Sequence, residues 1–365
     1  TGRPTTEKQK IALWSPSIRR LVDATRDSPA WLRGASGSLL FYLWVGDGLA
    51  DGIQGLAHKP EEIAKVGKAY QRLSKAIGVP IDYVYQVRRP SIDPAYIDSI
   101  VKTFPAVWGW TASEENLDFW DYLAKRCRES GCLYTQSVYP DYYTSKTYRK
   151  GRGDHAIVPT TEALKLGTGA LERHYRVTRL SRVQRQLLER AVRHDVKLIN
   201  YVSWNDFPEG HHLAPERSHN FGPSLLLRHF KRLWKTKNAK VARDEAIVFF
   251  KKYRHDARPK HPVSIRIKSL EKNLAGEDRI ELVTLLTRPA TCFLNGRSLG
   301  LVEQGLRALS VPSSPGRVRV RIVRDGEEII SFTTPQAITD APLRTDRLTY
   351  SYSSAFEREH GKLFD

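Results

Sequence analysis

The sequence predicts a mixed α/β protein, a (β/α)8 barrel followed by a small antiparallel β-sandwich. Helical segments and short apolar strand segments take turns from about residue 61 to residue 253, as in a parallel sheet with crossover helices. The strand candidates number about seven, close to the eight of a closed barrel. From about residue 262 the pattern changes to strands of period two. An open doubly wound sheet is the alternative, but no Gly-rich phosphate loop follows any strand.

The length of the chain indicates more than one domain. At 365 residues it exceeds what one ordinary hydrophobic core organises. We expect a catalytic barrel over residues 1–258, a β-sandwich accessory domain over 259–340 and a C-terminal tail over 341–365.

In the first half of the chain, helix signals precede each strand candidate. Ile63, Val66 and Tyr70 recur at helical spacing, and Asp93 followed by Pro94 is an N-cap with proline at the first helical position. Helices are expected at residues 61–77 and 93–104, and strands at residues 10–14, 38–45, 80–87 and 106–110.

The second half continues this alternation and then changes to β hairpins. Asn295-Gly296 and Asp325-Gly326 are dipeptides that favour tight hairpin turns. Helices are expected at residues 113–130, 182–195 and 223–234, and strands at 132–140, 196–204 and 245–253. The strands expected for the β domain lie at residues 263–270, 279–286, 290–302 and 317–332.

The composition is that of a globular protein, with 40% hydrophobic and 27% charged residues. The net charge of +19 is spread along the chain without a basic block or a base-stacking motif, so we expect no nucleic-acid partner. No apolar run approaches the length of a membrane span. Cys127, Cys132 and Cys292 form no metal framework and do not decide the compartment. We expect a monomer that is secreted or periplasmic, with any export signal absent from this sequence.

The segment "LINYVSWNDFPEGHHLAPE", residues 198–216, places polar residues directly after a strand. In a barrel, the loops after the strands build the active site. Asp206 and Glu209 can divide labour, one donating a proton to a leaving oxygen and the other activating water. Trp204 offers a flat face for a sugar ring and Asn205 a partner for a sugar hydroxyl. The pattern therefore indicates glycoside chemistry.

Two other interpretations of this loop are open. Acidic and amide residues after a strand often only cap the next helix. Asp206, Glu209, His211 and His212 are also all metal-ligand types. Adjacent histidines do not easily face one ion, however, and no other metal motif appears, so we expect neither a metal nor another cofactor.

Two further strand ends carry aromatic residues. Trp108 and Trp110 end one strand, where they either pack in the core or form a sugar platform. Tyr139 and Asp141 belong to a tyrosine-rich loop after another strand, and such a loop suits stacking and hydroxyl contacts. All four are candidate substrate-binding residues.

A family resemblance becomes visible at these residues. "SWNDFPEGHHLAP" resembles the Trp-Asn-Asp-aromatic-x-Glu-Ser/Gly-His signature of glycoside hydrolase family 71, the endo-α-1,3-glucanases or mutanases. It also looks like the Asn-Glu-Trp-x-Glu-Gly segment of the family 99 endo-α-mannosidases. "IVFFKKYRHDARP" is similar to the aromatic-Tyr-Arg segment after the last strand of those glucanases. The likeness covers residues 105–335.

The resemblance implies an inverting endo-hydrolase with Asp206 and Glu209 as its acid and base. Asn205 and His211 would line the sugar site. His212 stands where the family often has an aromatic residue, and Pro208 replaces the usual small residue. These departures affect the substrate linkage more than the reaction type.

We therefore expect a glycoside hydrolase that cleaves an α-linked polysaccharide or oligosaccharide. Which carboxylate is the acid stays open, and our hypothesis has Glu209 donate the proton while Asp206 activates water. An inverting pair should be separated by roughly 6.5–9.5 Å. The alternative is a non-catalytic polysaccharide-binding protein that retains the cleft.

Overall fold

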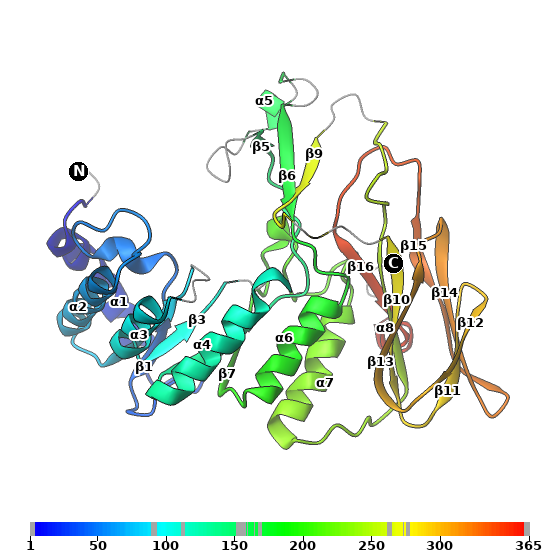
Figure 1. The fold of residues 1–365 in the computed structure, drawn as a ribbon, viewed down its shortest axis with the longest axis horizontal. Coiled ribbons are helices and arrows are strands. Elements are labelled where there is room, and N and C mark those ends of the chain that lie inside the picture. The colour runs from blue at the N-terminus through cyan, green and yellow to red at the C-terminus, as the bar shows by residue number, and fades with distance from the viewer. Residues whose placement is uncertain are drawn as a thin grey trace. The chain divides into compact units, whose positions relative to one another are not determined.

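A computed structural model describes most of the chain (Figure 1). The described residues are 4–88, 93–110, 114–150, 158, 160–163, 165–166, 170–260, 265–272, 274 and 278–360. The chain divides into two compact units. Unit 1 comprises Thr1–Ser137 and His194–Asn200, and unit 2 comprises Val138–Arg193 and Tyr201–Asp365.

Unit 1 is built on a five-stranded sheet with the order β1-β2-β3-β4-β7, in which β1 to β4 pair in parallel. The strands are β1 (Leu39–Tyr42), β2 (Ile81–Gln86), β3 (Ala106–Trp108), β4 (Leu133–Val138) and β7 (Leu198–Tyr201). The helices are α1 (Glu7–Thr25), α2 (Pro60–Ile77), α3 (Pro94–Thr103) and α4 (Leu117–Ser130). The predicted alternation of helices and parallel strands is confirmed in this unit.

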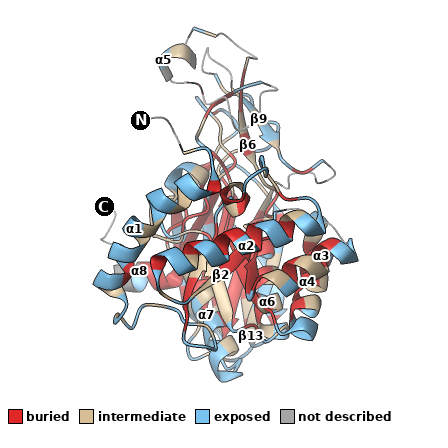
Figure 2. Ribbon diagram, turned by 90° about the vertical axis from the view of Figure 1, so that its left-hand side faces the viewer, coloured by how far each residue is buried: buried red, intermediate tan, exposed pale blue. Residues whose placement is uncertain are grey.

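The helix boundaries follow the expected signals. The Asp93 side chain accepts a hydrogen bond from the backbone N–H of Ala95 and so caps α3. Helix α2 ends at Gly78, whose φ of 76° is the left-handed conformation that glycine adopts without strain. Figure 2 shows buried and exposed residues alternating along α2, as expected of an amphipathic helix.

The strand expected at residues 10–14 is wrong, because these residues lie within α1. The side chains of Thr6 and Gln9 form a reciprocal capping box that begins this helix. A short apolar run is compatible with either element, and here the cap upstream decides for the helix.

Unit 2 contains three sheets, with the orders β13-β10-β8-β16, β12-β11-β14-β15 and β5-β6-β9. The first two consist of β8 (Glu245–Lys251), β10 (Arg279–Leu286), β11 (Ala290–Leu294), β12 (Arg297–Val302), β13 (Gly305–Pro312), β14 (Gly316–Arg324), β15 (Glu327–Ile338) and β16 (Thr349–Ser353). The third consists of β5 (Tyr148–Arg149), β6 (Leu171–Tyr175) and β9 (Arg266–Ser269). The helices are α5 (Thr160–Ala163), α6 (Arg182–Arg193), α7 (Gly222–Thr236) and α8 (Ser354–His360), with α6 and α7 side by side in Figure 1.

Two expected strands pair differently from the prediction. Strand β8 does not continue the parallel series but pairs antiparallel with β10 and β16. All its residues are buried, and a continuous apolar run does not distinguish a parallel strand from a central antiparallel one. Strand β9 pairs in parallel with β6 rather than joining the antiparallel sheets.

The antiparallel sheets have the predicted hairpins and one shared core. Asn295 and Gly296 have φ values of 51° and 80°, and Asp325 and Gly326 have 52° and 85°, as a tight hairpin turn with two left-handed residues requires. Buried side chains from both four-stranded sheets, among them Phe250 of β8, belong to a single hydrophobic cluster.

The structure thus confirms a mixed α/β chain with a parallel sheet, crossover helices and separate antiparallel sheets. A closed ring of eight parallel strands is not found among the described residues, so the full barrel and the sandwich remain predictions. The domain boundaries predicted at residues 258 and 340 also remain predictions. Within the described ranges, no helix is both long and apolar enough to pass through a bilayer.

The pairing of β8 with β16 predicts a specific cross-link. Ile247 lies directly opposite Ser353, so Ile247→Cys with Ser353→Cys should form a disulfide on mild oxidation, detected by mass spectrometry of the joined peptides. The control is Ile247→Cys with Ser351→Cys, because Ser351 lies opposite Phe249 and the diagonal pair is about 7–8 Å apart. Equal cross-linking of both pairs, or of neither, would contradict the register.

Candidate active site

Two loops of unit 2 meet directly after neighbouring strands of the sheet. Residues 139–147, the tyrosine loop, follow β4, and residues 202–219, the carboxylate loop, follow β7. The backbone N–H of Tyr143 donates to the carbonyl of Glu209 at 3.0 Å, and that of Ser145 to the carbonyl of Pro208 at 2.6 Å. The backbone of the tyrosine loop therefore supports the part of the carboxylate loop that holds the acidic residues.

Gly210 permits this close approach. Its φ of 68° lies in the left-handed region, and a Cβ placed on it would be 3.0 Å from the backbone oxygen of Tyr143. Any side chain at this position would push the two loops apart. The glycine immediately follows the short 3₁₀ turn Phe207–Glu209, so it sets the direction in which Glu209 leaves the backbone.

Asp206, Glu209 and His211 form one polar cluster. Each offers one ligand-type atom within 4.8 Å of the others. Nε2 of His211 lies 3.1 Å from Oε2 of Glu209 and 3.6 Å from Oδ2 of Asp206, so the buried imidazole sits between the two carboxylates. The side chains of Asp206 and Glu209 are 37% and 18% exposed, so neither is turned into the packed interior.

Lys146 of the tyrosine loop completes the cluster. Its Nζ lies 2.6 Å from Oε1 of Glu209, which is bound on its other oxygen by His211. The hydrogen bond from His211 and the charge of Lys146 lower the pKa of Glu209 to about 2, although partial burial opposes them. This environment favours the ionised form of Glu209, whereas our hypothesis has Glu209 hold the proton for the leaving group. Which carboxylate is the acid stays a prediction.

The two carboxylates lie close together, with an oxygen of Asp206 within 4.8 Å of one of Glu209. His211 lies near both groups. The separation of roughly 6.5–9.5 Å expected between the carboxyl groups of an inverting pair stays a prediction.

Exposed aromatic rings border the carboxylates. Trp204 is 64% exposed and Phe207 is 49% exposed, and Asn205 between them is also exposed. Apolar rings of this size are seldom left in water unless they contact a partner. Beneath them, the ring of Tyr142 stacks on that of His211, with 5.9 Å between centroids.

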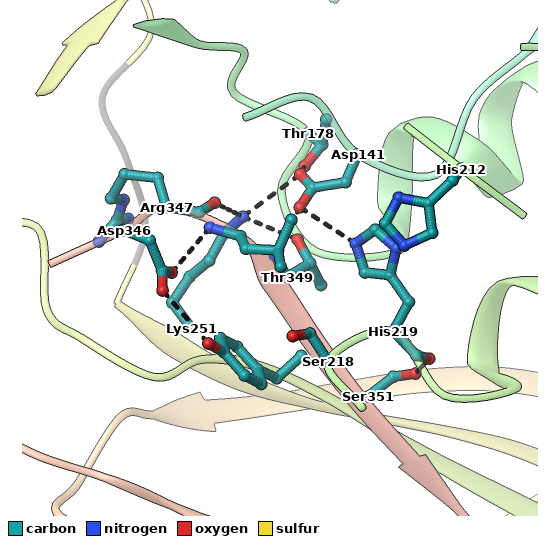
Figure 3. Close-up of polar contacts among 12 residues, drawn as sticks. Asp141, Thr178, His212, Ser218, His219, Lys251, Asp346, Arg347, Thr349 and Ser351 are labelled. Atoms are coloured by element: carbon teal, nitrogen blue, oxygen red, sulfur yellow. Dashed lines mark hydrogen bonds and ion pairs between the residues drawn. The ribbon is translucent and has the colours of Figure 1, made fainter. Parts of the chain in front are cut away.

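Asp141 is buried, whereas we expected it at the mouth of a sugar site (Figure 3). It accepts hydrogen bonds from the Thr178 hydroxyl at 3.0 Å and from the backbone N–H of Thr349 at 2.5 Å. Nζ of Lys251 lies 3.4 Å away. Burial by itself raises the pKa of Asp141, but Lys251 and His219 outweigh it and the pKa is lowered, so the carboxylate is charged.

The other predicted site residues fall into two groups, one in each unit. Tyr139 and His212 are buried in unit 2, at 1% and 2% exposure. Trp108 and Trp110 lie in unit 1, where Trp108 is buried and donates to the carbonyl of Leu43. Trp110 packs against the exposed ring of Trp44, with 4.1 Å between centroids. The structure brings together only Asp206, Glu209 and His211, with Trp204 and Asn205 beside them in the chain.

Sequence reasoning missed four residues of this region. Lys146 carries no local signal, because its partner Glu209 is remote in the chain. Phe207 stands inside the quoted motif but was not considered for its exposure. Glu216 and His219 follow the motif at metal-ligand spacing, which a search for His and Glu pairs would have found.

Comparison with known proteins supports the resemblance stated above. The model of Glycosyl hydrolase family 71 matches residues 177–352. The match includes the whole carboxylate loop, so the predicted resemblance to this family is confirmed over that range. No curated protein sequence matches the chain.

Several solved structures resemble this chain at low identity and low TM-score. The GH99 endo-alpha-mannosidase from Bacteroides thetaiotaomicron is 15% identical, with a TM-score of 0.39 over 64% of this chain and 64% of that chain. A glycosyl hydrolase family 2 member from Bacteroides cellulosilyticus is 13% identical, with a TM-score of 0.42 over 89% of this chain and 35% of that chain. The chain therefore spans less than two thirds of either protein, and such TM-scores say nothing about its substrate.

The buried position of Asp141 predicts its role in stability. Asp141→Ala should lower the free energy of unfolding by about 3–5 kcal/mol, because it leaves the Lys251 charge buried without its carboxylate partner. The measurement is urea denaturation followed by circular dichroism. The matched control is Asp256→Ala, which removes an exposed pair with Arg254 and should change the free energy of unfolding far less. Equal losses in the two variants would contradict the buried ion pair.

The lowered pKa of Glu209 predicts a pH-dependent contribution to stability. The ionised group stabilises the folded chain fully above its unfolded pKa of 4.5, and this contribution is lost as the pH falls toward about 2. The difference in unfolding free energy between wild type and Glu209→Gln should therefore shrink between pH 5 and pH 2, measured by denaturant titration. A difference independent of pH would show that Lys146 and His211 do not hold the carboxylate ionised.

Proposed function

We propose that this chain is a glycoside hydrolase that cleaves internal linkages of an α-linked polysaccharide of the α-1,3-glucan type. The observation that carries the proposal is the Asp206–Glu209 pair joined by His211, on a loop bordered by exposed aromatic rings. The family 71 match over this loop supports the reaction class, and the resemblance to endo-α-1,3-glucanases supports the linkage.

The charges favour one assignment of the acid and the base. Glu209, held ionised by Lys146 and His211, accepts a proton from the water that attacks the anomeric carbon. Asp206, the more exposed of the two, donates a proton to the glycosidic oxygen as the carbon–oxygen bond breaks. This order reverses our initial hypothesis. His211 contacts both carboxylates and can hand the proton back from Glu209 to Asp206 after turnover.

The expected stereochemical outcome is inversion, as the resemblance implies. An inverting reaction needs room for water between the base and the sugar. Asp206 is the group that must move to make this room, because Glu209 is held on both oxygens whereas Asp206 lies 3.6 Å from His211 and is more exposed. Substrate binding would draw Asp206 outward toward the glycosidic oxygen.

Sugar contacts come from the exposed part of the loop. Trp204 and Phe207 offer apolar faces, and Asn205 offers hydrogen bonds to hydroxyl groups. Tyr139, Asp141 and His212 are buried, and in this proposal they support the site rather than touch the sugar. Trp110 with the exposed Trp44 is the part of the predicted aromatic platform that remains available to a ligand in unit 1.

The expected location, oligomeric state and partner are also part of this proposal. A hydrolase of insoluble or cell-wall glucan would act as a secreted or periplasmic monomer, with carbohydrate and not nucleic acid as its partner. The predicted division into a catalytic domain and a β accessory domain also stays part of the proposal.

The proposal predicts separate effects on hydrolysis and binding. Purified protein should release oligosaccharides from α-1,3-glucan, and Asp206→Asn and Glu209→Gln should each reduce kcat at least about 1,000-fold because each removes one proton-transfer step. Both variants should bind the glucan within about threefold of wild type in a pull-down assay. Trp204→Ala should instead raise KM several-fold. NMR of the first products should show the β-anomer if inversion is correct.

A matched control and a rival outcome make this test decisive. Glu303→Gln changes an exposed acidic residue between β12 and β13 and should leave hydrolysis unchanged. If wild type binds the glucan but cleaves no α-glucan, α-mannan or arabinan, the chain is a polysaccharide-binding protein. If the first product is the α-anomer, the reaction is retaining and the inverting route is wrong.

A further inference from the structure

A second cluster lies on the carboxylate loop, just beyond the proposed catalytic residues. His212, Glu216 and His219 each offer one ligand-type atom, and these atoms lie within 4.8 Å of one another. The two adjacent histidines of the motif thus face different groups, His211 toward Glu209 and His212 toward Glu216. The objection that neighbouring histidines cannot share an ion does not apply to this set.

The two imidazoles of the cluster are buried without hydrogen bonds. His212 and His219 are each 2% exposed. Among the described residues, none of their four ring nitrogens has a partner at hydrogen-bond geometry. Carboxylate oxygens of Glu216 and Asp141 lie 3.3 Å from Nε2 of His212 and 3.6 Å from Nε2 of His219, and neither approach is a hydrogen bond. Buried polar nitrogens normally have hydrogen-bond partners. Two rings without such partners are therefore expected to bind a ligand that does not come from the protein residues.

The distances fit a divalent metal ion. Nε2 of His212 lies 3.3 Å from Oε1 of Glu216, and Nδ1 of His219 lies 4.0 Å from the same oxygen. Ligands about 2.0–2.1 Å from a tetrahedral zinc ion are about 3.3–3.4 Å from one another. The first pair already has this separation, and the second needs a shift of about half an ångström.

Asp141 lies next to this cluster, beside His219. Its Oδ2 lies 3.6 Å from Nε2 of His219, the ring nitrogen that points away from Glu216. In Figure 3 the His212 ring lies against the His219 ring, and Asp141 is on the other side of His219. Metal-bound histidines commonly donate their second nitrogen to a carboxylate, which orients the ring. Asp141 is itself held by Lys251 and Thr349.

The loop holds the ligands in place before any ion binds. The carboxylate of Glu216 accepts hydrogen bonds from the backbone N–H groups of Ser218 at 2.7 Å and His219 at 2.6 Å. The hydroxyl of Ser351 in β16 donates to the carbonyl of His219. The three ligands therefore sit on one tight turn that is fastened to the antiparallel sheet, and little entropy remains to be lost on binding.

We propose that His212, Glu216 and His219 bind a divalent transition-metal ion of the zinc class, with water as the fourth ligand. Two imidazoles and one carboxylate are a ligand set that zinc uses in proteins. The ion joins His212, Glu216 and His219 within this turn and has a structural role. The site is separate from Asp206 and Glu209, and its existence does not depend on hydrolase activity.

The rival explanation is that the two rings are held by carboxylates alone, without any metal. Nε2 of His212 lies 3.3 Å from Glu216, and Nε2 of His219 lies 3.6 Å from Asp141. In that case the protein would bind no zinc at this cluster.

The test begins with wild-type protein, which needs no variant to fold. After treatment with a chelator at pH 7.5, the protein is dialysed against zinc and analysed by elemental mass spectrometry and X-ray absorption. We expect one zinc per chain, two imidazoles in its coordination shell and a melting temperature that rises with zinc concentration. A folded, metal-free protein that binds no zinc and whose melting temperature ignores zinc would overturn the proposal.

Variants then locate the ion. His212→Gln and Glu216→Gln should weaken zinc binding at least 100-fold in protein that circular dichroism shows to be folded. Glu209→Gln and His255→Gln remove one member from each of two other clusters, Asp206/Glu209/His211 and His255/Asp256/Asp278, and should change the zinc Kd less than twofold. Loss of zinc in Glu209→Gln with retention in Glu216→Gln would place the ion elsewhere and refute the assignment. Hydrolysis is not part of the readout, so failure of the proposed function leaves this result unaffected.

Discussion

Unit 2 depends on the interactions of one buried charged side chain, that of Asp141. This carboxylate follows β4, and it is bound by Lys251 at the end of β8, by Thr349 at the start of β16 and by Thr178 before α6. Four segments far apart in sequence thus converge on one side chain. Because a buried carboxylate is tolerated only with charge and hydrogen-bond partners, each segment is confined to the place where its group reaches Asp141.

The contacts of Asp141 also hold the carboxylate loop, which carries the candidate active site. His219 lies against Asp141, and Gly210 allows the backbone of the loop to approach that of Tyr143. The loop is therefore held at Gly210 and at His219, while Trp204 and Phe207, which precede Gly210, stay exposed. A rigid frame with an exposed acidic and aromatic turn is the arrangement that a site for a bulky polymeric substrate requires.

Two carboxylate–histidine sets stand next to each other on this loop, and their surroundings give them different properties. Glu209 and Asp206 remain accessible to water, and Lys146 keeps Glu209 charged. His212 and His219 are buried, and His219 lies against Asp141 and β16. The adjacent residues His211 and His212 belong to different sets because successive side chains leave the backbone in different directions. One short segment can thus hold both the proposed catalytic groups and a structural cluster, because the two sets share no side chain.

Much of this was readable from local sequence. The helix over residues 61–77, the Asp93 cap and the two hairpin turns follow from short-range periodicity, capping and glycine conformation, which depend on neighbours in the chain. The motif around Asp206 and Glu209 was also visible, because its members lie within four residues of one another. The resemblance that this motif carries agrees with the family match over residues 177–352.

What only the tertiary structure decided concerns groups that meet from distant parts of the chain. The antiparallel pairing of β8, the burial of Asp141 and the ion pair between Lys146 and Glu209 each depend on a partner many residues away. An apolar run or an acidic residue has the same local appearance wherever its partner lies. The sequence by itself therefore determined the elements and the acidic motif, whereas packing decided which strand pairs with which, which carboxylate is buried, and which one is held ionised at the surface.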